Sequence, residues 1–233
     1  MARAGSCCAL TLALPPTHSS RSTASALIKP GTKGAYGRAH HGIQSFIEAG
    51  AYKVVDLCPD WFLSNWFGSA GEVKAAGRLS LPVAGTGPQI SMIDPRDVGL
   101  AAAAILQQPA AGLAPFLAAR RLEVKGASKA NFAGVAAELS AAVGYPIALN
   151  PIPRAAFVAT LQSFGVPRVF ANSFLETYEQ ADGVVPPGYE GYGPALLAGW
   201  EQPPAPELLA IGWRARTVKE WANDPATKAV FAK

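Results

Sequence analysis

Two short apolar runs, at residues 54–57 and 90–93, constrain the fold of this chain more than any other feature of its sequence. Each run ends two residues before a proline, Pro59 or Pro95, and a helical pattern of apolar residues follows each of them. Buried strands that alternate with helices are typical of an α/β layer and not of a helix bundle or a β-sandwich. The sequence therefore predicts an α/β fold.

The charge of the chain is spread unevenly along its length. Of its 233 residues, 20 are basic and 16 are acidic, which gives a formal net charge of +4. Five basic residues precede Glu48, the first acidic residue, so the rest of the chain has 15 basic and 16 acidic residues. A nucleic-acid surface needs Lys and Arg clustered on a folded face. We therefore expect no nucleic-acid partner.

Cysteine and histidine are scarce. Cys7, Cys8 and Cys58 cannot form a disulfide framework, and the three histidines lack the spacing of a zinc site, so we expect no metal and a reducing compartment. We interpret Cys58 as a small buried apolar residue. No apolar run reaches the ~18 residues of a membrane span. We therefore expect a cytoplasmic protein without a membrane partner.

Residues 1–35 differ in composition from the rest of the chain. They are rich in Ala, Ser, Thr and Arg, contain no acidic residue, and are interrupted by Pro15, Pro16 and Pro30. Organellar transit peptides share this composition, which would place the protein in a plastid or mitochondrion. A disordered tail or a mispredicted first exon is the alternative interpretation.

Gly31, Gly34 and Gly37 have the GxxGxxG spacing of a dinucleotide-binding turn. Such a turn follows a buried strand, and Pro30 stands where that strand should donate a hydrogen bond. Asp56 ends the next strand, about where an acid that binds a ribose belongs. In a chain with 23 glycines this spacing arises easily by chance, so we favour a turn and linker over a dinucleotide fingerprint.

The rest of the chain alternates between strand and helix patterns. Predicted strands lie at residues 53–57, 78–83, 121–126 and 148–152. Predicted helices lie at residues 38–48, 97–107, 128–143, 154–164, 169–181 and 217–221. Asp94 and Ser128 are the expected N-caps of the second and third helices, and Thr217 begins a capping box. A Gly-rich hairpin region is expected at 68–89 and an irregular loop at 183–212.

Aromatic residues gather in two places that could be core or pocket wall. Residues 61–67 form a dense patch, which we interpret as core, although Ser64 and Asn65 beside it could line a pocket. The helix at 169–181 carries Phe170, Phe174, Leu175 and Tyr178 at helical spacing. For Asp94 and Asp97 we favour helix capping over a paired-carboxylate acid/base site.

Four segments together resemble the C-terminal part of NmrA-like proteins, the atypical short-chain dehydrogenase/reductases. They are YGRAHHGIQSFIEAG at 36–50, CPDWFLSN at 58–65, ISMIDPRD at 90–97 and RTVKEW at 216–221. The likeness covers residues 36–222. It implies an incomplete Rossmann-like parallel sheet that holds only the late strands, with a small α+β substrate domain.

The resemblance also implies how the chain is divided. Residues 36–110 would form the C-terminal part of the NAD(P)-binding domain, and residues 117–222 the substrate or lid region, after a tail at 1–35. The family carries its glycine fingerprint well upstream of the helix at 38–48. We therefore expect this chain to be truncated.

The function implied by the resemblance is an NAD(P)H-dependent oxidoreductase that acts on a small carbonyl, quinone or imine. Its cofactor would be NADP or NAD, its partner a small molecule, and its oligomeric state stays open. A non-catalytic dinucleotide-sensing regulatory protein or an inactive remnant is the alternative. It gains support because histidine, at His40, replaces the lysine of the family's Tyr-x-x-x-Lys pattern.

The resemblance assigns candidate site residues to three roles. Tyr36 and His40 would be the catalytic pair that handles the proton. The cofactor would be bound by Pro59, Asp60, Trp61 and Asn65. The substrate would be bound by the aromatic side chains of Phe62, Trp66, Phe170 and Phe174.

Overall fold

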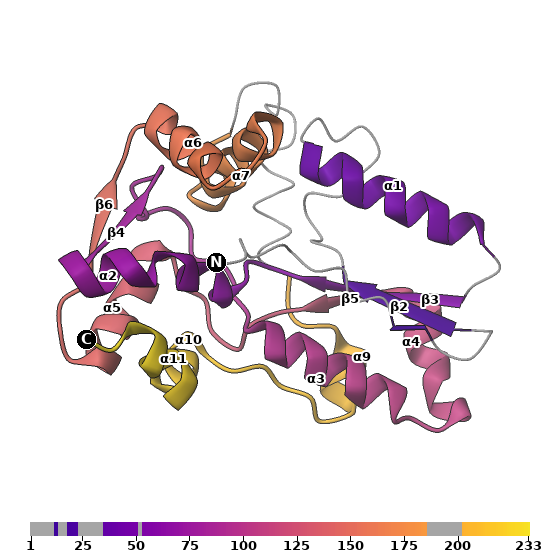
Figure 1. Ribbon diagram of the computed structural model, residues 1–233. Helices are drawn as coiled ribbons and strands as arrows, with labels where there is room; N and C mark the ends of the chain where they lie inside the picture. Colours follow the sequence, from indigo (N-terminus) through magenta and orange to yellow (C-terminus); the bar gives the residue numbers. More distant parts are fainter. Residues whose placement is uncertain (1–11, 14–17, 23–34, 51–52, 186–201) are drawn as a thin grey trace.

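A computed structural model describes residues 12–13, 18–22, 35–50, 53–185 and 202–233 of the chain (Figure 1). The main sheet has the strand order β1 (Leu12–Ala13), β2 (His18–Ser22), β3 (Lys53–Pro59) and β5 (Arg121–Val124). β3 runs parallel to both β2 and β5, whereas β1 is antiparallel to β2. The register places Leu57 of β3 opposite Leu122 of β5.

Helices cover both faces of the main sheet (Figure 1). One face carries α1 (Ala35–Ala49), and the other carries α3 (Pro95–Leu106), α4 (Ala114–Ala119) and α9 (Pro206–Ala210). Leu57 and Leu122 are fully buried and share a core with Val98, Ala102 and Ile105 of α3. A parallel sheet between helical layers confirms the predicted α/β fold.

A second, smaller sheet organises the other part of the molecule, which we call the small lobe. Its strands β4 (Arg78–Leu81) and β6 (Ala148–Pro151) are parallel. The helices of this lobe are η1 (Leu63–Ser69), α2 (Ala70–Ala76), α5 (Phe132–Val143), α6 (Arg154–Ser163), α7 (Arg168–Ala181), α10 (Val218–Asn223) and α11 (Pro225–Phe231). A 3-10 turn, η2 (Ala110–Leu113), precedes α4. The lobe has its own core, which includes Leu79, Phe132 and Trp221.

Local sequence explains many of the helix boundaries. The Asp94 carboxylate accepts a hydrogen bond from the backbone N–H of Arg96 at 2.9 Å, and Pro95 begins α3, which is a favourable start for a helix. Thr217 and Glu220 form the predicted capping box at α10. The predicted caps at Asp94 and Thr217 are therefore confirmed.

The predicted cap at Ser128 is wrong. Asn131 caps α5 instead, because its side-chain oxygen accepts a hydrogen bond from the backbone N–H of Gly134 at 2.9 Å. The Ser128 hydroxyl accepts a hydrogen bond from the backbone N–H of Val218 at 2.9 Å. Ser128 therefore joins the segment before α5 to the start of α10, a contact that no local pattern could indicate.

Three other segments also differ from the sequence prediction. Residues 206–210, expected within an irregular loop, form α9. Residues 70–76, expected within a hairpin region, form α2, since Val73 is fully buried in the core of the small lobe. Residues 90–93 form no extended strand. Ile90 bridges Ala130 and Ile93 bridges Phe62, so the segment pairs with two different partners.

Three strands of the main sheet lie within ranges predicted to be outside it. β1 and β2 fall in residues 1–35, predicted as a tail, and β5 falls in residues 117–222, predicted as the substrate region. β2 and β5 both pair with β3, so the late part of the chain contributes to both lobes. Gly31 and Gly34 lie outside the described residues. Within the described ranges, no helix has the length and apolarity to cross a membrane.

Candidate functional site

The candidate site lies at the carboxyl ends of the parallel strands, the edge where open α/β sheets bind their ligands. β3 ends at Pro59 and β5 ends at Val124, and these two residues are opposite each other in the sheet. The chain then leaves β3 through Asp60 and Trp61. The carbonyl of Trp61 accepts a hydrogen bond from the backbone N–H of Ile93 at 2.9 Å, which fixes the chain as it enters the small lobe.

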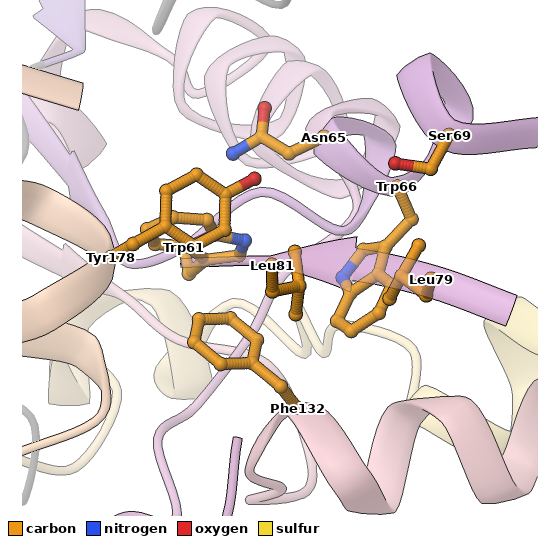
Figure 2. A pocket seen from close by; sticks show the side chains of 8 residues that line it. All are labelled: Trp61, Asn65, Trp66, Ser69, Leu79, Leu81, Phe132 and Tyr178. Atoms are coloured by element: carbon orange, nitrogen blue, oxygen red, sulfur yellow. The ribbon is translucent and has the colours of Figure 1, made fainter. Parts of the chain in front are cut away.

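A hollow of about 200 Å³, counted with its open mouth, lies beside this segment (Figure 2). Its walls come from η1, β4, α5, α7 and the residues after β3, so segments far apart in the sequence build it. The lining residues are Trp61, Asn65, Trp66, Ser69, Leu79, Leu81, Phe132 and Tyr178. None of these side chains is an acid, a lysine, an arginine or a histidine, so the lining is uncharged at neutral pH.

Aromatic rings form most of this lining. Trp61 packs edge-on against Phe132, at 5.3 Å between ring centroids, and against Tyr178 at 4.7 Å. Trp66 lies tilted against Phe132 at 5.7 Å. These distances and edge-to-face angles are favourable for aromatic pairs, so the rings hold one another in place. The hollow therefore has a flat-walled, apolar interior.

Polar groups also reach the hollow. Trp66 is only 4% exposed, and its indole Nε1 is buried with no hydrogen-bond partner in the described part of the chain. Figure 2 shows this nitrogen on the side of the ring that faces Leu81. Burial raises the pKa of Tyr178 to about 12, so its hydroxyl keeps its proton at neutral pH. The hollow thus combines apolar walls with hydrogen-bond donors.

A buried ionic cluster lies next to the hollow, at the ends of β3 and β5. Lys125 Nζ lies 2.7 Å from Asp60 Oδ1 and 2.8 Å from Glu123 Oε2, and the Lys125 side chain is 1% exposed. Burial raises the pKa of Asp60 to about 7, although the Lys125 ammonium opposes this shift. The two carboxylates raise the pKa of Lys125 against the effect of its own burial. Burial therefore makes the Asp60 carboxylate easier to protonate than an aspartate in water, even beside the Lys125 ammonium.

The predicted catalytic pair lies on α1. His40 is 8% exposed, and burial lowers its pKa, so the imidazole is neutral at neutral pH and can accept a proton. The side chain of Tyr36 lies outside the described part of the structure. α1 packs against α7, whose Tyr178 lines the hollow, but His40 itself is not part of the lining.

The predicted binding residues separate into different surroundings. Trp61, Asn65 and Trp66 line the hollow, and Asp60 lies in the ionic cluster beside it. Phe62 points away and packs with Ile93 and Val98 in the core of the main sheet. The remaining predicted residues lie outside the lining: Pro59 is buried at the end of β3, Phe174 is half-buried on α7, and Phe170 is 38% exposed on the same helix.

The structure adds lining residues that the sequence did not assign to a site. Leu79 and Leu81 alternate along β4, which places them on the same face of the strand. Phe132 is the first residue of α5, directly after its cap Asn131. Only the strand alternation was visible in the sequence, and it could not indicate which neighbours the strand faces.

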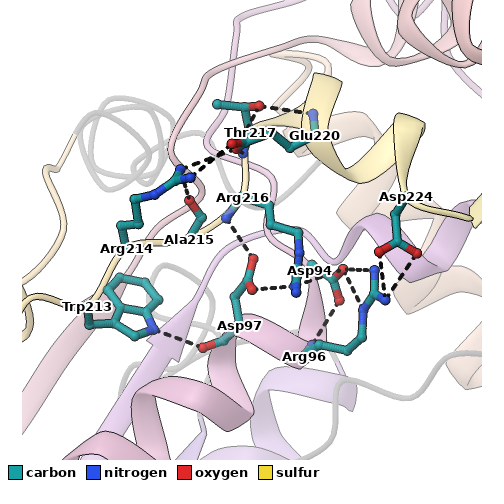
Figure 3. A network of polar contacts seen from close by, with 10 residues as sticks. All are labelled: Asp94, Arg96, Asp97, Trp213, Arg214, Ala215, Arg216, Thr217, Glu220 and Asp224. Atoms are coloured by element: carbon teal, nitrogen blue, oxygen red, sulfur yellow. Dashed lines mark hydrogen bonds and ion pairs between the residues drawn. The ribbon is translucent and has the colours of Figure 1, made fainter. Parts of the chain in front are cut away.

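Asp94 and Asp97 belong to a network that joins α3 to the C-terminal segment (Figure 3). Asp97 forms an ion pair with Arg216 and accepts a hydrogen bond from the backbone N–H of Arg216 at 2.8 Å. The carbonyl of Asp97 also accepts a hydrogen bond from Trp213 Nε1 at 3.1 Å. We call this network the polar clamp; its members are Asp94, Arg96, Asp97, Trp213, Arg216 and Asp224. These contacts favour the structural interpretation of the two acids over an acid/base site.

The described residues fit one end of a bound dinucleotide better than the other. Uncharged aromatic and amide side chains after β3 suit a flat nicotinamide ring. A pyrophosphate needs glycines that let it approach the backbone. At Gly87 and Gly126 an added Cβ would collide with the backbone carbonyls of Asp182 and Met92, so these glycines allow protein backbone to approach instead.

Scans against protein-family models and against curated proteins find no match to this sequence. Solved structures do match. A nucleoside-diphosphate-sugar epimerase from Staphylococcus aureus aligns with a TM-score of 0.59 at 14% identity over 85% of this chain and 62% of its own. The NADPH-dependent quinone oxidoreductase QOR2 from Escherichia coli, complexed with NADPH, aligns with a TM-score of 0.59 at 18% identity, over 87% of this chain and 63% of its own.

NmrA, a negative transcriptional regulator, aligns with a TM-score of 0.51 at 12% identity over 90% of this chain and 64% of its own. The chain has the Rossmann-like fold of NmrA and QOR2. The resemblance to NmrA-like proteins that the sequence motifs indicate is therefore confirmed at the level of the fold. The chain spans less than two thirds of the length of each of these proteins.

Proposed function

We propose that this chain supplies the substrate side of an NAD(P)H-dependent oxidoreductase of the NmrA-like type, which acts on a small carbonyl, quinone or imine. The observation that carries this proposal is the uncharged aromatic hollow at the carboxyl end of β3, on a fold shared with an NADPH-dependent reductase. A hollow in the small lobe, beside the end of β3, suits a small substrate that must meet a cofactor at the sheet edge.

The roles that we assign to individual residues follow from their positions. NAD(P)H, when bound, supplies the hydride. We assign Trp61 and Asn65 to the wall that contacts both the nicotinamide and the substrate, because they line the hollow after the end of β3. Reduction also requires a proton at the substrate oxygen or nitrogen; His40 is buried and neutral, so it can relay that proton toward the substrate, with Tyr36 as its candidate partner on the same helix.

A second candidate function is a dinucleotide sensor without turnover. Two observations favour it: histidine occupies the lysine position of the Tyr-x-x-x-Lys pattern, and the regulator NmrA shares the fold. An inactive remnant would retain the fold and neither bind nor turn over the cofactor.

Thermal unfolding in the presence of NADPH separates these functions. A ligand at 100 times its Kd stabilises the folded state by ~2.7 kcal/mol, so both the reductase and the sensor should melt at a higher temperature with NADPH. The absence of any shift would contradict both. Where a shift occurs, oxidation of NADPH with a panel of carbonyls, quinones and imines distinguishes the reductase from the sensor.

His40 provides the test of the catalytic assignment, and His41 provides a matched control on the same helix. We expect His40→Gln to lower turnover roughly 100-fold, as loss of a general acid or base does, and to leave the NADPH-induced shift unchanged. His41→Gln should retain full turnover. Equal turnover in the two variants would remove His40 from the mechanism.

A further inference from the structure

The indole N–H of Trp66 has an unusual environment. An indole nitrogen can only donate a hydrogen bond, and leaving a buried donor without an acceptor costs stability. Trp66 is 4% exposed, and no acceptor for its Nε1 exists among the described residues. Trp213, at 7% exposed, donates to the Asp97 carbonyl at 3.1 Å. The fold therefore satisfies one buried indole and leaves the other facing the hollow.

The lining of the hollow restricts the charge of any ligand. An ion that enters loses its hydration and needs a partner of opposite charge, and none of the eight lining side chains is charged. The charged residues directly next to lining residues in the sequence are already paired: Asp60 with Lys125, Arg78 with Glu72, and Glu179 with Arg154. An uncharged ligand is therefore favoured over a cation or a carboxylate.

The size and walls of the hollow restrict the shape of the ligand. Its volume of about 200 Å³ includes the space of the open mouth, so the enclosed part is smaller still and has no room for a drug-sized ligand. The rings of Trp61, Phe132 and Tyr178 offer edges and faces to a further flat ring. A single aromatic ring with a small substituent meets both conditions.

We propose that the hollow binds a small, uncharged aromatic ketone or aldehyde, whose carbonyl oxygen accepts a hydrogen bond from Trp66 Nε1. This inference rests on the proposed function and deepens it, because it selects an uncharged aromatic hydrogen-bond acceptor over charged substrates. Tyr178 and Asn65 line the same space and can provide further hydrogen bonds to the ligand.

The test compares two ligands of the same shape in the absence of NADPH. Acetophenone carries the carbonyl oxygen, and α-methylstyrene has a CH₂ group in its place. Titration calorimetry should give a Kd for acetophenone about tenfold lower than for α-methylstyrene, the worth of one hydrogen bond. Trp66→Phe should abolish this difference, whereas the matched control Trp213→Phe should keep it.

Each contrary outcome overturns the inference. If neither ligand saturates, or if Trp66→Phe keeps the tenfold difference, the indole does not bind a carbonyl, and Trp66 Nε1 then holds a water molecule only. Equal binding of benzyltrimethylammonium would overturn the preference for an uncharged ligand. If Trp66→Phe fails to fold, the NMR signals of the indole N–H groups in the unmodified protein test the inference instead. The Trp66 signal should then shift with acetophenone and not with α-methylstyrene. Because the cofactor is left out, a failure here is separate from a failure to bind NADPH.

Discussion

The hollow and the polar clamp both bury a tryptophan, yet they treat its N–H group differently. In the clamp, Trp213 donates to the Asp97 carbonyl, and the side chains of the network have partners (Figure 3). At the hollow, Trp66 Nε1 has no partner among the described residues, and the neighbouring Asp60 Oδ2 also lacks a hydrogen bond there. The two regions bury their tryptophans to almost the same depth. The difference between them therefore lies in whether the polar groups have hydrogen-bond partners.

This difference separates a structural region from a functional one. The clamp connects α3 to a segment more than a hundred residues later, and satisfied polar groups make that connection stable. The hollow instead retains unsatisfied groups within an uncharged aromatic wall, which costs stability and makes sense where a ligand supplies the missing acceptor.

The largest effect that we predict concerns the pH dependence of stability on the hollow side. The pKa of Asp60 is about 7 in the folded protein against 3.8 as the ordinary value. Between about pH 4 and pH 7 the unfolded chain releases this proton while the folded chain retains it, so the free energy of unfolding falls as the pH rises. The loss should reach about 4 kcal/mol.

Asp60→Asn isolates this contribution, because the amide does not titrate. Urea unfolding across the same window should show the unmodified protein losing about 4 kcal/mol more than the variant. Parallel stability curves for the two proteins would mean that Asp60 is charged throughout this window. The contrast between the two regions would then be weaker.

The next largest effect tests the clamp. Asp97→Ala removes the closer ion pair of Arg216 and the acceptor of the Arg216 backbone N–H, so that the guanidinium keeps only Asp94, at 3.6 Å, and the N–H loses its partner. We expect the free energy of unfolding to fall by about 3 kcal/mol, measured by urea unfolding. Lys219→Ala, at an exposed position on α10, is the control and should stay within about 0.5 kcal/mol of the unmodified protein. A similar small loss in Asp97→Ala would show that the clamp is not structural.

The smallest effect compares the two tryptophans directly. Trp213→Phe should lower the free energy of unfolding by about 1 kcal/mol more than Trp66→Phe, because only Trp213 loses a hydrogen bond. Both variants remove the same atoms from buried positions, so the loss of packing largely cancels. Equal losses, again from urea unfolding, would mean that Trp66 has a partner in solution.

Much of the fold follows from local sequence. Helix starts at Asp94 and Thr217 were predicted because their capping bonds join residues within three positions of each other. Ser128 and the bridging segment 90–93 were not, since their partners lie far away in the sequence. Short-range chemistry fixes where elements begin, but it does not indicate which distant segment a hydroxyl or a backbone group will meet.

The candidate site divides in the same way. Trp61, Asn65 and Trp66 directly follow β3, so their place at the sheet edge could be predicted. Phe62 next to Trp61 faces the opposite core, because neighbouring side chains in extended backbone point to opposite sides. Phe132 enters the hollow from another element, and only the long-range packing within the small lobe brings it there.

The central claim is that the Trp66 N–H is a donor for a ligand carbonyl, and its NMR signal tests this most directly. Indole N–H signals of the ¹⁵N-labelled protein, with Trp66 and Trp213 assigned from their phenylalanine variants, should be followed during titration with acetophenone and with α-methylstyrene. We predict a downfield shift of the Trp66 signal with acetophenone only, and a constant Trp213 signal with both. A Trp66 signal that moves equally with both ligands, or with neither, would contradict the account.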